Sequence, residues 1–177
     1  MKLPHLAATN GHKDVIDILL HYGAYYNFRN KFEQTPLHKT KNESITSLLR
    51  TVEKLFDAVR SNDSSEVETQ LKSNASGFCF INAKCVTNDT VLHQASRNGY
   101  ERIVEVLMKH KANPNIHNRD RCTPLHYAAE FSYFGIVTAL LSNGAIHDAV
   151  SKSRKTPLKL AVDKHVIDVL RIFKKHL

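Results

Sequence analysis

Apolar residues recur along this chain at helical spacing, in short stretches that polar turns separate. The clearest stretches are Val15–Leu20, Ile103–Met108 and Ile136–Leu141, in which apolar side chains return every three or four residues. This spacing places them on one face of a helix, and that face needs a partner to cover it. Gly23 follows the first stretch and the pair Asn98-Gly99 precedes the second, as turn residues do at helix ends. The pattern predicts an all-α chain of short helices joined by tight turns.

One kind of helix opening recurs at a fixed interval. Thr-Pro-Leu-His stands at residues 35–38 and 123–126, Thr-Val-Leu-His at 90–93, and Thr-Pro-Leu-Lys at 156–159. Thr123 follows Thr90 by 33 residues, and Thr156 follows Thr123 by the same number. Threonine can cap a helix start, and proline after it has no N–H to lose. A constant period of this size indicates stacked repeats, each of which buries its apolar face against its neighbours.

These openings resemble the ankyrin repeat, whose mark is Thr-Pro-Leu-His-x-Ala at this period. The resemblance is most specific from Thr90 to Gly144 and weakest over residues 39–89. It implies a solenoid of about five stacked helix-turn-helix units, some degenerate, with β-turn finger loops between them. In that family the motif histidine bridges neighbouring turns through hydrogen bonds. The matching structural residues are Thr35, His38, Thr90, His93, Thr123, His126 and Thr156.

The repeat spacing changes in the middle of the chain, which predicts two blocks. Ile45 follows Thr35 by only 10 residues, and Val166 follows Thr156 by the same number, whereas the regular repeats have 13. The first block covers residues 1–51 and holds two repeats, the second one shortened. The second block covers residues 52–177, with a degenerate repeat at 52–89, repeats at 90–122 and 123–155, and a shortened C-terminal cap at 156–177. Alternatively, Ser44 to Arg60 forms one longer helix.

The finger loops depart from the family pattern, which usually has glycine four residues into the turn. Here Glu33, Asn88, Arg121 and Arg154 take those positions. Asparagine accepts a left-handed backbone, whereas arginine and glutamate do so at some strain. We therefore expect fingers that are less regular than the family pattern. Lys159 replaces the bridging histidine in the last repeat, as suits a cap.

Positive charge is concentrated at the C-terminal end of a chain whose net charge is +8. Residues 149–177 carry eight cations: Lys152, Arg154, Lys155, Lys159, Lys164, Arg171, Lys174 and Lys175. Such an end could attract nucleic acid, an acidic protein or a membrane surface. Alternatively, it is the solvated outer face of a capping repeat. Phe173 is the single aromatic residue near these cations, which ranks nucleic acid last among the partners.

The sequence holds no pattern typical of an enzyme or a metal site. The eleven histidines form neither HExxH nor zinc-type spacings, and nucleophile-elbow, P-loop and GxGxxG motifs are missing. Cys79, Cys85 and Cys122 cannot all pair and match no CxxC motif. We therefore predict no catalytic residue, no cofactor and no metal. Reduced thiols and the lack of a signal peptide or membrane span predict a cytoplasmic or nuclear location.

The resemblance implies a monomeric adaptor or scaffold that binds another protein, without a small-molecule substrate. In this family the partner usually meets a concave face formed by finger loops and first helices. Carried over by position, with aromatic and arginine residues favoured as anchors, the candidate partner-binding residues are Arg97, Asn98, Arg119, Asp120, Tyr127, Glu130, Phe131, Lys152 and Lys155. One alternative is the ankyrin segment of a larger effector or a toxin-like protein, because uneven repeats also resemble latrotoxin-type arrays. The second alternative is electrostatic binding of nucleic acid or acidic surfaces through the basic C-terminal end.

Overall fold

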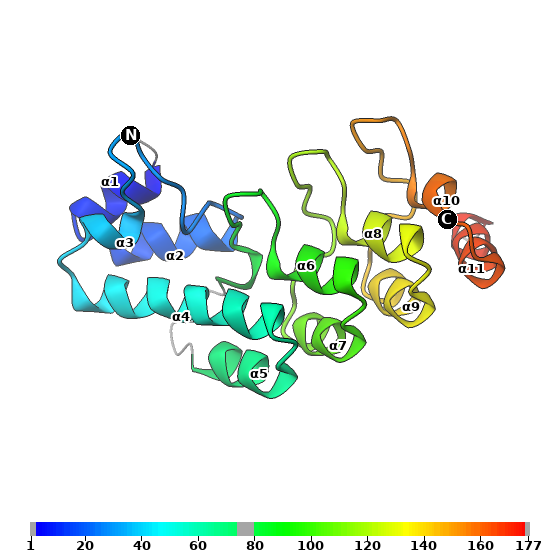
Figure 1. Cartoon of the computed structure of the whole chain (residues 1–177), viewed down its shortest axis with the longest axis horizontal. Helices are drawn as coiled ribbons and strands as arrows, with labels where there is room; N and C mark the ends of the chain where they lie inside the picture. Colours follow the sequence, from blue (N-terminus) through cyan, green and yellow to red (C-terminus); the bar gives the residue numbers. More distant parts are fainter. Residues whose placement is uncertain (1–2, 74–79, 176–177) are drawn as a thin grey trace. The chain divides into compact units, whose positions relative to one another are not determined.

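The computed structural model describes residues 3–73 and 80–175 (Figure 1), so Cys79 lies outside the described residues. Within these residues the regular secondary structure consists of helices, apart from one isolated bridge between Tyr25 and Lys84. Turns and loops connect the helices. The chain divides into two compact units, Met1–Val91 and Leu92–Leu177, here called unit 1 and unit 2. Each unit is built from paired helices linked by finger loops, which confirms the predicted all-α fold of helix-turn-helix repeats.

Unit 1 contains five α-helices and one 3-10 turn within the described residues. They are α1 (Leu3–Thr9), α2 (Lys13–His21), α3 (Pro36–Lys39), α4 (Glu43–Arg60), α5 (Ser64–Lys72) and η1 (Phe80–Asn82). Helix α1 packs against α2 and α3, helix α4 against α5, and η1 against α2. Tyr26 contributes a buried ring that stacks on Phe56 of α4 with 4.8 Å between centroids. This contact joins the first repeat to the long helix.

Helix α4 confirms the alternative of one longer helix in the middle of the chain. The Asn42 side chain caps its start by accepting the Ile45 N–H at 3.2 Å, and the helix runs for 18 residues. One face of it is buried along its whole length, through Ile45, Leu48, Leu49, Val52, Leu55, Phe56 and Val59. Residues 51 and 52, between which the sequence analysis divides the two blocks, both lie inside this helix. The division into two blocks stays a prediction.

Unit 2 continues the same pairing in a more regular form. Its helices are α6 (Val91–Asn98, which begins at the division between the units), α7 (Glu101–Lys109), α8 (Pro124–Glu130), α9 (Phe134–Ser142), α10 (Pro157–Leu160) and α11 (Lys164–Lys175). The first helices α8 and α10 pack together, and the second helices α7, α9 and α11 form another row (Figure 1). The core between the rows includes Leu107, Leu125, Ile136, Leu140 and Leu170.

The two shortened repeats have a common structural cause. Their first helices, α3 and α10, are only four residues long, whereas the helices that follow have 18 and 12 residues. Thr40 and Ala161 end the short helices with extended backbones, at ψ 142° and 132°. The second helices therefore begin early, as the spacing of Ile45 and Val166 predicts.

Motif histidines link successive turns as the resemblance implies, with one exception. Three hydrogen bonds of this kind run from His5 Nε2 to the Gln34 oxygen (2.9 Å), from His93 Nε2 to the Cys122 oxygen (3.1 Å) and from His126 Nε2 to the Lys155 oxygen (3.2 Å). Each bond spans 29 residues. His126 Nδ1 also accepts the Thr123 N–H at 3.0 Å. The proton of the neutral ring therefore lies on Nε2, where it reaches the next turn.

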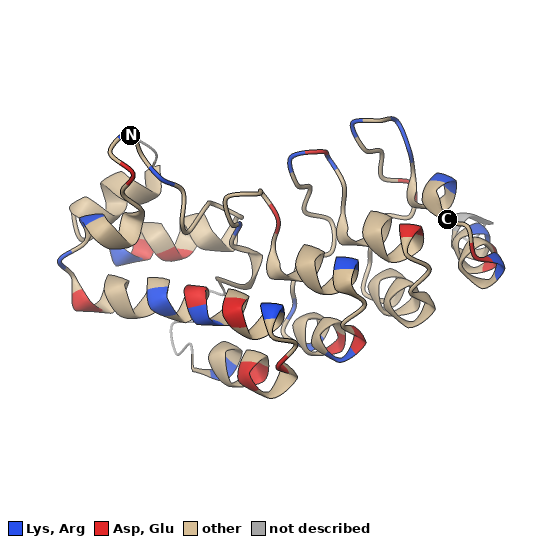
Figure 2. Ribbon diagram, viewed as in Figure 1, with Lys and Arg blue, Asp and Glu red and all other residues tan. Residues whose placement is uncertain are grey.

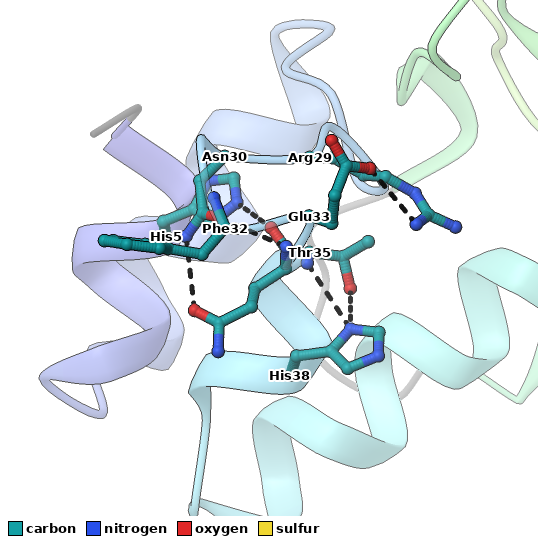
Figure 3. Close-up of polar contacts among 8 residues, drawn as sticks. His5, Arg29, Asn30, Phe32, Glu33, Thr35 and His38 are labelled. Atoms are coloured by element: carbon teal, nitrogen blue, oxygen red, sulfur yellow. Dashed lines mark hydrogen bonds and ion pairs between the residues drawn. The ribbon is translucent and has the colours of Figure 1, made fainter.

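The prediction that His38 bridges neighbouring turns is wrong. Its Nδ1 lies 2.7 Å from Thr35 Oγ1 and completes the helix cap, as Figure 3 shows. Its ring is exposed, and within the described residues its Nε2 forms no hydrogen bond to a backbone carbonyl. The residue 29 positions further on is Val67, which lies within helix α5 and not in a finger. The bridge fails because helix α5 occupies the positions at which the other repeats have the accepting finger.

Acidification is expected to destabilise the chain through His126. Burial lowers the pKa of its imidazole below the ordinary value of 6.5, although the hydrogen bond to the Lys155 carbonyl opposes this. Below about pH 6.5 the unfolded state binds the proton more readily than the folded state, so stability falls as pH drops. We expect His126→Gln to lose less unfolding free energy than the wild type between about pH 7.5 and pH 5, measured by urea unfolding. His165→Gln, at an exposed ring, is the control. If His126→Gln loses as much unfolding free energy over this pH range as the wild type does, the prediction is contradicted.

Candidate functional site

The finger loops share one tight turn, so the expectation of less regular fingers is wrong. In the 118–122 finger, Asn118 N–H donates to the Cys122 oxygen at 3.0 Å, and Arg121 N–H donates to the Asn118 oxygen at 3.1 Å. The 151–155 finger repeats this pattern, from Ser151 to Lys155 and from Arg154 to Ser151, at 3.0 Å each. The fingers that begin at residues 30 and 85 close in the same way. The departures from glycine do not alter the turn.

The predicted left-handed backbone is present at all four of the positions that the family pattern reserves for glycine. The φ angles are 60° at Glu33, 70° at Asn88, 57° at Arg121 and 57° at Arg154. A left-handed conformation brings the Cβ of an ordinary residue close to the backbone and costs roughly 1–2 kcal/mol. The arginines therefore occupy these positions at a cost in stability.

Asn118 organises its finger, and the sequence analysis did not single it out. Its side chain is 6% exposed, and its Oδ1 accepts the N–H groups of Asp120 (3.0 Å) and Cys122 (3.1 Å). Its Nδ2 donates to the Tyr127 hydroxyl at 2.8 Å. A signal was available, because short polar residues stand five positions before each motif threonine: Asn30, Cys85, Asn118 and Ser151. The 33-residue period could have identified them.

Asn118→Ala is expected to lower the free energy of unfolding by roughly 1–3 kcal/mol, because it removes the partners of two backbone donors and one hydroxyl. Asn118→Ser is the matched control, since serine occupies the equivalent position 151 and there accepts the Lys155 N–H. We expect the serine variant to lose less than the alanine variant in urea unfolding followed by circular dichroism. Equal losses would show that the side-chain acceptor is dispensable.

Three elements of unit 2 meet at Tyr127. The Arg97 guanidinium, from α6, lies over the Tyr127 ring at 4.1 Å, and Asn118 holds its hydroxyl from the finger. The edge of the His93 ring also faces it, with 6.4 Å between centroids. Burial raises the pKa of the Tyr127 phenol, outweighing the hydrogen bond from Arg97 that lowers it. The phenol therefore stays neutral and is held in one position.

Phe131 is the exposed aromatic residue of the predicted set. It follows α8, is 48% exposed and lies 6.1 Å from the Tyr133 ring, between centroids. Tyr133 was not among the predicted site residues. Asn98 and Glu130 are exposed at the ends of α6 and α8. Of the predicted anchors, the structure thus brings Arg97 and Tyr127 into contact and pairs Phe131 with a residue that the sequence analysis missed.

The remaining predicted residues lie on the two fingers of unit 2. Arg119, Asp120, Lys152 and Lys155 are all exposed there, and the ribbon of both fingers carries the blue of Lys and Arg in Figure 2. The Lys152 N–H donates to the Asp120 oxygen at 2.8 Å and so joins the two loops. Arg121 and Arg154 are exposed on the same loops. Arg154 is one of the predicted C-terminal cations, but neither arginine belongs to the predicted partner-binding set.

Neither a metal-binding cluster nor a membrane-spanning helix is present in the part of the chain that the structure describes. Over residues 3–73 and 80–175, no group of three or more His, Cys, Asp or Glu side chains could hold a metal ion. None of the described helices is long and apolar enough to cross a membrane. The described residues of unit 2 instead present partly exposed arginine, tyrosine and phenylalanine side chains on paired helices and hydrogen-bonded turns.

Paired helices in two rows, finger loops and histidine bridges between turns define a stacked-repeat protein. A family model of three ankyrin repeats matches residues 55–150, which is more than half of the 177-residue chain. A single-repeat ankyrin model matches residues 5–31. The chain therefore belongs to the ankyrin repeat family, whose members generally mediate protein–protein interactions and are typically non-catalytic. No curated protein matches the chain.

Proposed function

We propose that the chain is a non-catalytic adaptor or scaffold that binds a partner protein on the face formed by the fingers and first helices of unit 2. The contact residues are Arg97, Asn98, Arg119, Asp120, Tyr127, Glu130, Phe131, Lys152 and Lys155. Membership of a family of protein-binding modules supports the class of function. The Arg97–Tyr127 contact beside the fingers is the observation that favours this face.

Arg97 and Tyr127 are already ordered in the folded chain, which supports this choice of face. Ordering a flexible side chain on binding costs about 0.5–1.5 kcal/mol. Arg97 is already held over Tyr127, and Tyr127 is held by Asn118, so most of this cost is met during folding. Arginine, tyrosine and other large aromatic residues supply most hot spots at protein interfaces. Phe131, half exposed beside Tyr133, adds apolar area for a partner to cover.

Site-specific photo-crosslinking in the source cell tests this proposal. One variant of the intact chain carries p-benzoylphenylalanine in place of Phe131. The control carries it in place of Arg102, whose side chain is 74% exposed on α7 of the same unit. We expect a partner protein to crosslink through position 131 and not through position 102. Crosslinking through position 102 alone, or equally through both positions, would contradict this assignment of the face.

The wider setting of the module is also a proposal. A cytoplasmic or nuclear location is part of this proposal, because ankyrin repeat proteins are commonly intracellular. The monomeric state and the alternative of a larger effector or toxin-like protein stay predictions, because no feature of the described residues distinguishes them.

A further inference from the structure

We infer that the two fingers of unit 2 bind an acidic peptide segment of the partner, and that Arg121 and Arg154 contact its carboxylates. This inference rests on the proposed function and specifies the chemistry of the partner. The site, here called the basic strip, consists of Arg119, Arg121, Lys152, Arg154 and Lys155, with Asp120 among them. Three observations support it: the hydrogen bonds that close the loops, their uncompensated charge and the left-handed backbone of the two arginines.

The loops that carry the basic strip are fixed in the folded chain. Each finger closes through its own backbone hydrogen bonds, and the Lys152 N–H joins the fingers through the Asp120 oxygen. Asn118 and Ser151, both nearly buried, brace the two turns through their side chains. A ligand therefore meets cations on a preformed backbone, and binding does not have to order the loops.

The cations of the basic strip form no ion pair within the part of the chain that the structure describes. All five cations are exposed. The fingers of unit 1 differ. There Arg29 pairs with Glu33 at 3.3 Å and Lys31 lies over the Phe32 ring, while residues 86–89 contain no cation. The basic strip is thus particular to the unit 2 fingers, and like charges gathered this way favour an anionic ligand.

The backbone conformation of the two arginines also supports the inference. Both have φ 57°, in the left-handed region. The chain uses asparagine, which tolerates this region better, at the same turn position 88. Glu33 is also left-handed, but its side chain pairs with Arg29. Lys111 (φ 63°) and Ser132 (φ 60°) share this conformation outside the basic strip, so strain at a surface position counts here only together with the uncompensated charge. For Arg121 and Arg154 an external carboxylate supplies the contact that Glu33 finds within its own loop.

A peptide fits the basic strip better than a nucleic acid does. Binding of single strands usually relies on aromatic side chains that stack on the bases, and residues 118–122 and 151–155 include none. Asp120 also stands among the cations as a hydrogen-bond acceptor. A peptide backbone has N–H groups to donate to it, whereas a phosphodiester backbone has none. The arginine guanidinium matches a carboxylate in a two-bond geometry.

Fluorescence anisotropy on the intact chain tests the inference. The probe is a fluorescein-labelled peptide of alternating glutamate and glycine, and a peptide with glutamine in place of glutamate reports neutral binding. Arg121→Asn with Arg154→Asn removes two cations and leaves residues that accept the left-handed backbone. Arg102→Gln with Lys109→Gln removes two exposed cations from α7 of the same unit. We expect the finger variant to bind the acidic peptide about tenfold more weakly at low ionic strength, and the α7 variant to bind like the wild type.

Thermal unfolding of the finger variant separates binding from folding. Because asparagine relieves the backbone, its melting temperature is expected to equal or exceed that of the wild type. Equal weakening in the two double variants, or wild-type affinity in the finger variant, would overturn the inference. Tighter binding of a labelled oligothymidylate than of the peptide would overturn the peptide as the ligand.

The two proposals fail in distinguishable ways. If a partner crosslinks through position 131 while the finger variant keeps its affinity for the acidic peptide, the inference fails and the proposed function stands. If the finger variant loses peptide binding while position 131 captures no partner, the basic strip stands and the wider face is wrong.

Discussion

Leu125→Ala is expected to lower the free energy of unfolding by roughly 2–5 kcal/mol, the usual range for a fully buried leucine. Leu125 has no exposed surface and lies on α8, which packs against both α9 and α10. Alanine removes its apolar contacts and leaves a cavity that the flanking helices close only in part. Urea unfolding followed by circular dichroism at the helix band measures the loss, since the chain has no tryptophan.

The chain provides a matched control for this prediction. Leu158 occupies the same motif position in α10 but is only partly buried, so Leu158→Ala is expected to cost clearly less, about 1 kcal/mol. The contrast tests whether burial between stacked repeats, and not the motif position itself, determines the cost. Equal losses at the two positions would contradict the stacking argument.

Gly99→Ala is expected to destabilise the chain by roughly 2–4 kcal/mol, by adding steric overlap to backbone strain. Gly99 has φ +75°, and a Cβ there would lie 2.7 Å from Tyr133 Cζ and 2.8 Å from Cε1. The Tyr133 ring also pairs with Phe131, so it cannot move aside without loss. Thermal or urea unfolding gives the size of the effect.

Gly144→Ala separates the cost of the left-handed backbone from the cost of steric overlap with a neighbouring side chain. Gly144 has a similar φ of +83°, but nothing lies within 4 Å of the added Cβ. We expect it to cost only the left-handed penalty of roughly 1–2 kcal/mol. Gly99→Ala combined with Tyr133→Ala should cost less than the sum of the two single variants. A Gly99→Ala variant no less stable than Gly144→Ala would show that the ring accommodates the methyl group freely.

Much of the candidate site depends on contacts between residues of different repeats, which the sequence of one repeat does not reveal. Arginine and aromatic residues on first helices are recognisable by position, and so Arg97, Tyr127 and Phe131 were predicted. The Arg97–Tyr127 contact was not, because the two residues come from different repeats. Tyr133 was missed for the same reason, because only the folded repeats bring its ring against Gly99. Asn118 differs: its Oδ1 accepts N–H groups of its own finger, and the 33-residue period could have identified it.

The amino-acid sequence by itself determined the repeat period, the helix caps and the left-handed finger positions. The caps and finger turns depend on residues within about four positions of one another, and the period shows where the same local chemistry recurs every 33 residues. Tertiary structure decided which apolar faces are covered and which motif histidines bond a neighbouring turn. Helix α4 continues through residues 51 and 52, because its apolar face is covered along its whole length. His38 keeps its cap but has no finger to bridge, whereas His126 reaches Lys155. A hydrogen bond across 29 residues exists only where a neighbouring turn is placed to accept it.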